Sequence, residues 1–273
     1  MRAGHPALEV REGIERSELD LLSRAHPELH AIARWDLDHC PGAVTFYSLR
    51  SEGRLVSYLL CWRADPKHPV VHWTGAPAGW KLLEDHLPDP PYTAVVSPAV
   101  FRQVEWPRRS TSHIEDLWFR ARTRRLPSQA TVLPPEYLLR RLTGEDGELI
   151  ARFVQTHPNL PDHSRIDPSD LSHAVVHAVV RTRGGRSEIV AVARTGPMLP
   201  EIWMLGGVFT DPRHRRQGFG TAVTLGLTLE AKRNGADAGL YVRPENLPAT
   251  RAYRAVGFRR TLSRVFVETR PDD

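Results

Sequence analysis

A run of basic residues stands directly before two glycines in the segment DPRHRRQGFGTA, residues 211–222. Arginine side chains can donate charge-assisted hydrogen bonds to an anion. Gly218 and Gly220 have no side chains, so an anion can approach the backbone closely and a positive φ is available. If a helix begins after Gly218, the unpaired amides of its first turn favour an anion as well. These residue types suit a diphosphate-binding loop, and an ordinary basic surface loop is the alternative.

Two better-known phosphate loops do not match this segment. A Walker loop requires Gly-Lys followed by Ser or Thr, whereas Gly220 is followed here by Thr221 and Ala222. A dinucleotide-binding fingerprint requires a third glycine where this chain has Val223. The loop must therefore be interpreted together with the rest of the chain.

A second motif, NLPATRAYRAVGF, follows at residues 246–258 after one helical and one strand-like segment. It combines an asparagine, a helix that carries Tyr253, and a terminal Gly-Phe pair. Together with R-x-x-G-x-G after a strand ending in V-F-T-D-P, it resembles the signatures of the GNAT superfamily of acyl-CoA-dependent N-acyltransferases. The resemblance covers about residues 131–270, and the two-lobe layout is similar to glycine N-acyltransferase-like and mycothiol synthase-like proteins.

The resemblance implies that the end of the strand at 202–210 binds the pantetheine arm of coenzyme A through its backbone. The residues concerned are Val208, Phe209 and Thr210, and the N–H of Val208 would donate to the thioester carbonyl oxygen and stabilise the oxyanion. The pair Gly206-Gly207 fits a β-bulge where the backbone bends away, or else a tight packing position.

The resemblance also places the diphosphate of coenzyme A in the glycine loop. The residues expected around it are Arg215, Arg216, Gln217, Gly218, Phe219, Gly220 and Thr221. Asn246 is expected to contact the cofactor or to cap the helix that follows, and capping is the role that its residue type favours.

Tyr253 is the candidate general acid, because a phenol can protonate a leaving thiolate without itself being ionised at neutral pH. The alternative is that Tyr253 only packs its helix against the sheet. Glu201, at the start of the strand that leads to Val208, is the candidate general base. A one-residue shift of register would turn its side chain to the other face of the sheet. The alternative is an exposed glutamate at the end of a strand. Asp162 and His163 are weaker candidates.

The pattern of apolar residues predicts the elements that position these groups. In the first half it predicts a helix at 14–35, strands at 43–49, 54–62 and 70–75, and a short helical piece at 80–87. In the second half it predicts a strand at 136–142, a helix at 144–157, a hairpin from 174–182 and 187–195, strands at 201–210, 238–244 and 261–269, and a helix at 246–258. In the segment 221–233 apolar residues alternate as they do in a strand. The segment ends in basic residues followed by Asn-Gly, which is typical of a helix C-terminus and favours a helix.

The chain has 273 residues, which favours two domains. The proline-bearing segment 123–135 predicts the boundary between a degenerate GNAT-like domain, 1–130, and a catalytic domain, 131–273. The expected fold class is α/β with mixed sheets: two GNAT-like lobes, each a mostly antiparallel sheet flanked by helices. In the C-terminal lobe the strands at 201–210 and 238–244 are expected to splay and form the cofactor cleft.

The net charge of +5 suits anionic ligands. With two cysteines, no secretory signal and no long apolar run, we expect a cytoplasmic protein without a membrane partner. A zinc site at His173 and His177 is not favoured, because no glutamate lies between them and the run reads as a strand. The basic run at 120–125 lacks a nucleic-acid-binding motif, which disfavours nucleic acid as a partner. The sequence does not indicate an oligomeric state.

These observations predict an N-acyltransferase that moves an acetyl or other short acyl group from acetyl-CoA, or another short-chain acyl-CoA, to a primary amine. A small-molecule or amino-acid acceptor is favoured, with direct attack and no metal. The alternatives are a non-catalytic acyl-CoA-binding or sensing protein and a protein or peptide N-acetyltransferase.

Overall fold

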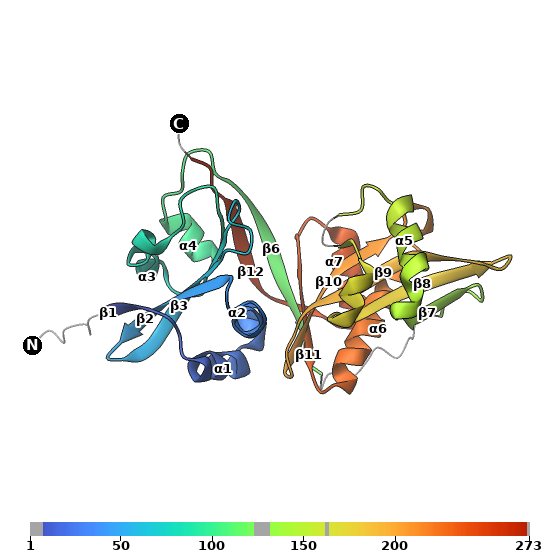
Figure 1. Ribbon diagram of the computed structural model, residues 1–273, viewed down its shortest axis with the longest axis horizontal. Coiled ribbons are helices and arrows are strands. Elements are labelled where there is room, and N and C mark those ends of the chain that lie inside the picture. The colour runs from blue at the N-terminus through green and yellow to red at the C-terminus, as the bar shows by residue number, and fades with distance from the viewer. Residues whose placement is uncertain (1–7, 123–131, 162–163, 272–273) are drawn as a thin grey trace, which may run out of the picture. The chain divides into compact units, whose positions relative to one another are not determined.

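The computed structural model describes residues 8–122, 132–161 and 164–271 (Figure 1). The chain divides into unit 1, Met1–Asp116 with Leu262–Asp273, and unit 2, Leu117–Thr261. Both divisions fall inside strands, because β6 (Thr111–Arg120) continues into unit 2 and β12 (Arg259–Glu268) continues into unit 1. The predicted domain boundary between residues 130 and 131 lies outside the described residues and remains a prediction.

Unit 1 is built on a sheet with the strand order β1-β2-β3-β4-β5-β12. Its pairs are antiparallel except for β4 and β5, which are parallel. Besides β12 and the first part of β6, its elements are β1 (Leu8–Glu12), α1 (Arg16–Ala25), α2 (Pro27–His39), β2 (Val44–Ser51), β3 (Arg54–Trp62), β4 (Val70–Trp73), α3 (Pro77–Lys81), η1 (Glu84–His86), β5 (Thr93–Val96) and α4 (Pro98–Gln103).

The single helix predicted at 14–35 is wrong, since this segment forms two helices, α1 and α2. The chain leaves helical geometry at His26, with φ of −139°, and Pro27 then occupies the first turn of α2. A proline inside a helix would remove a backbone hydrogen bond and clash with the preceding turn, whereas at the first turn it costs nothing. The strands predicted in unit 1 are confirmed as β2, β3 and β4, with β4 ending at Trp73.

Unit 2 has the strand order β11-β10-β9-β8-β7, in which only β10 and β11 are parallel. Its elements are β7 (Tyr137–Arg141), η2 (Gly144–Asp146), α5 (Gly147–Thr156), η4 (Pro168–Ser172), β8 (Val176–Arg183), β9 (Arg186–Met198), β10 (Ile202–Thr210), η5 (Pro212–His214), α6 (Phe219–Arg233), β11 (Asp237–Val242) and α7 (Leu247–Val256). Helices α5 and α6 lie on opposite faces of this sheet (Figure 1).

The alternation of side chains along β8 separates two apolar cores in unit 2. Val179 belongs to the core under α6 and α7, which also holds Phe219 and Tyr253. Its neighbour Ala178 belongs to the core under α5, with Phe153. The sheet therefore carries α6 and α7 on one face and α5 on the other.

The predicted hairpin and the ambiguous helix are both confirmed. Strands β8 and β9 are joined by Gly184 and Gly185, both with positive φ, as a two-residue hairpin turn requires. The segment with alternating residues is the helix α6, which ends at Asn234 and a left-handed Gly235. Because buried residues occur all around α6, its sequence lacks a clear helical stripe.

Candidate functional site

Strands β10 and β11 separate halfway along β10. Their pairing joins Ile202–Leu205 to Asp237–Leu240, and β10 then continues to Thr210 with no partner on that side among the described residues. A bulge against β9 lies between Gly206 and Phe209, and Gly207 has φ of 59°. The predicted bulge and the predicted splayed pair are therefore confirmed. Backbone groups that point toward β11 along this half of β10 have no strand to bind.

The loop between β10 and α6 presents its amides around a turn with two left-handed residues. Arg216 has φ of 64° and Gly218 has φ of 82°. Gly218 precedes α6, and no side chain caps that end of the helix. For the amides of residues 216–221, the described residues provide no hydrogen-bond acceptor. Successive free amides at a helix start form a cradle for an anion, and the helix dipole adds to it.

Side chains of this loop divide into those that point to solvent and those that hold the fold. Arg216 and Gln217 are exposed, and the exposed Arg215 donates from Nε to the Thr210 carbonyl oxygen at 3.2 Å. Phe219 is 1% exposed and packs against the Tyr137 ring at 4.6 Å, so only its amide is available to a ligand.

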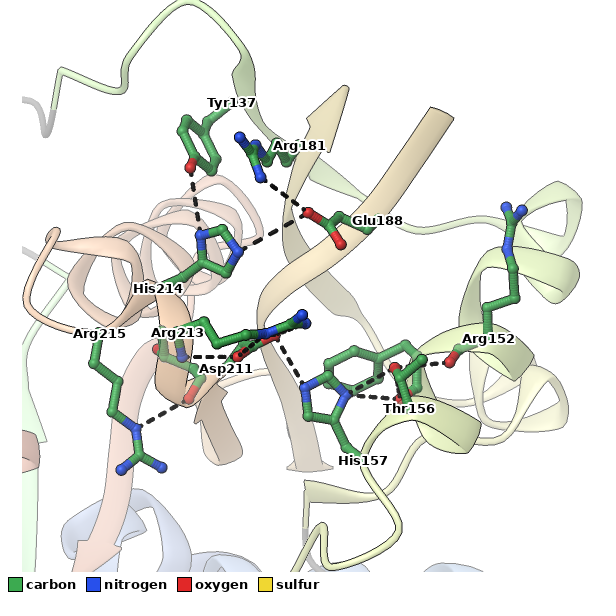
Figure 2. A network of polar contacts seen from close by, with 12 residues as sticks. Tyr137, Arg152, Thr156, His157, Arg181, Glu188, Asp211, Arg213, His214 and Arg215 are labelled. Carbon is green, nitrogen blue, oxygen red and sulfur yellow. Dashed lines mark hydrogen bonds and ion pairs between the residues drawn. The ribbon is translucent and has the colours of Figure 1, made fainter. Parts of the chain in front are cut away.

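The first side chain that holds the loop is Asp211, at the end of β10. It is 2% exposed and accepts hydrogen bonds from the Arg213 amide at 2.9 Å and Arg213 Nη2 at 2.6 Å. Its Oδ2 lies 3.2 Å from His157 Nε2, just after α5 (Figure 2). Burial raises the pKa of the Asp211 carboxyl group, but its contacts with Arg213 and His157 outweigh burial and lower the pKa to about 2.

A second contact holds the loop from the side of β7 and β9 (Figure 2). His214 is 8% exposed, and its Nδ1 lies 3.3 Å from the Tyr137 hydroxyl group. Its Nε2 lies 3.9 Å from Glu188 Oε1, and Glu188 in turn binds Arg181. The basic residues before the glycines therefore have two roles: Arg213, through its contact with Asp211, and the buried His214 fasten the loop, while the exposed Arg215 and Arg216 make no contact with a carboxylate among the described residues.

We expect Asp211→Asn to lower the free energy of unfolding at neutral pH by about 2 kcal/mol, because the lowered pKa shows that the fold stabilises the charged carboxylate. A depressed pKa contributes stability above the unfolded value of 3.8 that is lost as pH falls toward about 2. Urea unfolding of both proteins across this range should show the difference shrinking with falling pH. Asp167→Asn, an exposed helix cap, is the control and should cost less; a difference independent of pH would contradict this account of Asp211.

Tyr253 lies on α7 in the core that α6 and α7 share. It is 6% exposed, its ring centroid is 6.2 Å from that of Phe258, and burial raises its pKa to about 12. Its phenol is therefore neutral at physiological pH and keeps the proton that a general acid needs. Asn246 caps α7 by accepting a hydrogen bond from the Ala249 amide at 3.2 Å, which confirms the capping interpretation; a contact of Asn246 with the cofactor remains a prediction.

The position of Glu201 argues against its predicted role as general base. Glu201 directly precedes β10, and its carbonyl accepts from the Asp237 amide at the closed end of the β10–β11 pair. Val208 lies about 20 Å farther along the strand at the usual rise per residue. A general base must be within direct or one-water reach of its proton, which this separation does not allow. Asp162 and His163 lie outside the described residues.

The described residues contain no group of three or more His, Cys, Asp or Glu side chains that could hold a metal ion. His177 instead contacts Glu230 of α6 at 2.5 Å, across the sheet-to-helix packing. Within the same described ranges, the helices are too short or too polar to span a membrane.

Sequence reasoning missed the residues that fasten the loop, namely Asp211, His157, His214 and Tyr137. One of them had a local signal, because an aspartate directly before a proline is typical of the cap of a helical turn. His157 and Tyr137 had none, since they contact the loop from distant positions in the chain.

Residues 171–267 match the family model described as FR47-like protein. Similar solved structures include a Drosophila protein, with 17% identity over 97% of this chain and 99% of that chain and a TM-score of 0.69. A tandem GNAT protein from the clavulanic acid biosynthesis pathway has 16% identity over 98% and 100%, with a TM-score of 0.60. A GCN5-related N-acetyltransferase from Sphaerobacter thermophilus has 13% identity over 97% and 97%, with a TM-score of 0.61. No curated protein matches the sequence.

Proposed function

We propose that this chain, which has the tandem GNAT fold and an FR47-like domain, is an acyl-CoA-dependent N-acyltransferase. In this proposal an acetyl or other short acyl group passes from acyl-CoA to a primary amine of a small molecule or amino acid. The observation that carries the proposal is the set of free amides at 216–221, placed at the open end of the splayed strands β10 and β11.

The residues present fit the two ends of acyl-CoA. The loop amides, Arg215 and Arg216 would bind the diphosphate, and Gly218 and Gly220 would leave room for it. The free edge of β10, Val208–Thr210, would pair with the amides of the pantetheine arm as an added strand does.

Acyl-CoA supplies an activated thioester, and the protein is expected to contribute orientation, charge stabilisation and a proton. The Val208 N–H would donate to the carbonyl oxygen where negative charge develops during attack by the amine. Tyr253 would hold at its phenol oxygen the proton that the leaving thiolate takes. Asp211 and His214 would keep the loop in place while these groups act.

One observation supports a second candidate, a non-catalytic protein that binds and reports acyl-CoA. Strand β10 has no carboxylate between Ile202 and Thr210, and Glu201 lies far from Val208. A general base for the ammonium group is therefore not supplied by this strand.

We expect acetyl-CoA to raise the melting temperature of the full chain, since a ligand at about 100 times its Kd stabilises the native state by about 2.7 kcal/mol. We further expect release of free thiol when a panel of amines and amino acids is added. Thermal shift with acetyl-CoA, CoA and dephospho-CoA, followed by a thiol assay, measures both steps. Binding without thiol release for any amine would favour the sensing protein, and absence of binding would contradict both candidates.

A further inference from the structure

Unit 1 contains a nearly buried cation, Arg264 of β12. Its side chain is 8% exposed, and its Nη1 donates to the Trp73 carbonyl oxygen at 3.3 Å. Among the described residues no Asp or Glu side chain forms an ion pair with it. Since a guanidinium has several N–H donors, most of its hydrogen-bonding capacity is unused by the protein.

The strand register shows which side chains share the face of Arg264. His72 of β4 is level with Val95 of β5, and Val95 is level with Phe266 of β12. Side chains two positions apart on a strand point the same way, so Arg264 lies on the same face as His72. Leu60, level with His72 on β3, packs in the small core under α1 and α2. This is therefore the face of the sheet on which α2 lies.

The charge of Arg264 affects the pKa values of two histidines on this face. His30 of α2 is 6% exposed, and its Nδ1 lies 2.7 Å from the Tyr58 hydroxyl group. Burial, followed by the positive charges of Arg264 and His26, lowers the pKa of His30 to about 4. Burial, followed by the charge of Arg264, also lowers the pKa of His72 to about 4. Both rings are therefore neutral at physiological pH and can each offer an N–H to an anion.

The backbone explains why a cation is held at this position. The pairing of the parallel strands β4 and β5 ends at His72 and Val95, and the next carbonyl group, that of Trp73, accepts from Arg264. The Trp73 ring lies where a Cβ on Gly75 or Gly79 would be, so it fills the turn after β4. The two glycines after β4 therefore leave no open space, but a cation lies on the sheet face at the end of the two parallel strands.

An unpaired buried charge is costly, whereas an anionic partner would satisfy both the charge and the free N–H groups. We propose that Arg264, together with His72 and His30, binds the oxyanion group of a small ligand in unit 1. A carboxylate and a phosphate group share the required chemistry, since both accept from a guanidinium and from neutral imidazole N–H groups. None of these residues belongs to the acyl-CoA cleft, so the proposal is independent of the proposed function.

The test is titration of the full chain with sodium phosphate and, separately, sodium acetate at constant ionic strength. The ring signals of His30 and His72 are followed by NMR, because a bound anion favours the protonated rings and should raise their pKa values above about 4. Arg264→Gln should abolish this rise and weaken anion binding at least about 10-fold. Arg264→Lys, which keeps the charge, should retain part of it. Arg54→Gln removes one exposed charge from the same unit and should change nothing.

A response to phosphate alone or to acetate alone would support the site and identify the class of its ligand, and a response to both would support it as a general oxyanion site. Circular dichroism establishes that each variant is folded. The wild-type titration does not depend on any variant, so absence of a response to either anion would overturn the proposal. A response that persists unchanged in folded Arg264→Gln would overturn it as well.

Discussion

Substitution of Gly218 by valine is expected to weaken acetyl-CoA binding by about 100-fold, which corresponds to about 3 kcal/mol. Gly218 has φ of 82°, a conformation that a β-branched residue adopts only with strain of about 1–3 kcal/mol. Relaxation of that strain would turn the neighbouring amides away from the anion. The valine side chain would also stand at the helix start, where the diphosphate is expected to approach.

The matched control is Gly235→Val, at the opposite end of α6. Gly235 has φ of 77°, and a Cβ built on it meets no atom within 4 Å, so it imposes comparable backbone strain without affecting the loop. Isothermal titration calorimetry with acetyl-CoA should give nearly wild-type affinity for this variant. Equal losses in the two variants would mean that strain in the fold, rather than the loop, determines binding.

Tyr253→Phe is expected to lower kcat by about 100-fold while changing the Kd for acetyl-CoA by less than about twofold. The substitution removes the phenol oxygen and keeps the ring that packs in the core of unit 2. Because the pKa of Tyr253 is about 12, the phenol stays protonated through the alkaline range in which the rate can be measured. The wild-type rate should therefore not decline from ionisation of Tyr253 below that pH.

Tyr92→Phe is the control for Tyr253→Phe, since Tyr92 is also buried, also has its pKa raised to about 12, and lies in unit 1. Its kcat should remain close to that of the wild type. A wild-type kcat in Tyr253→Phe would assign Tyr253 to packing alone, which is the alternative that its burial also allows.

Local features of the sequence were enough to predict most elements of unit 2. The glycines at 184 and 185 fix a hairpin turn, and Asn234-Gly235 ends α6, because these signals act through the backbone of the residues themselves. The break between α1 and α2 also had a local cause, Pro27, which the apolar pattern of the surrounding residues hid.

The candidate site was predictable only in part, because its support comes from distant positions. The family resemblance of the two motifs indicated the loop and a candidate acid, Tyr253, but the contact of Asp211 with His157 depends on how α5 meets the end of β10. Arg213, in the same basic run as Arg215 and Arg216, is paired with Asp211, which is likewise not evident from the local sequence. Glu201 is a glutamate, which can act as a base. Its distance from Val208 became clear only from where β10 separates from β11 and bulges.

The proposed function depends on the backbone amides of residues 216–221, which are expected to hold the diphosphate of coenzyme A. A crystal structure of the full chain with CoA tests this contact. We expect diphosphate oxygens within hydrogen-bonding distance of these amides and the pantetheine arm along Val208–Thr210. A complex in which CoA is bound with its diphosphate elsewhere, and with these amides facing other protein groups, would contradict it.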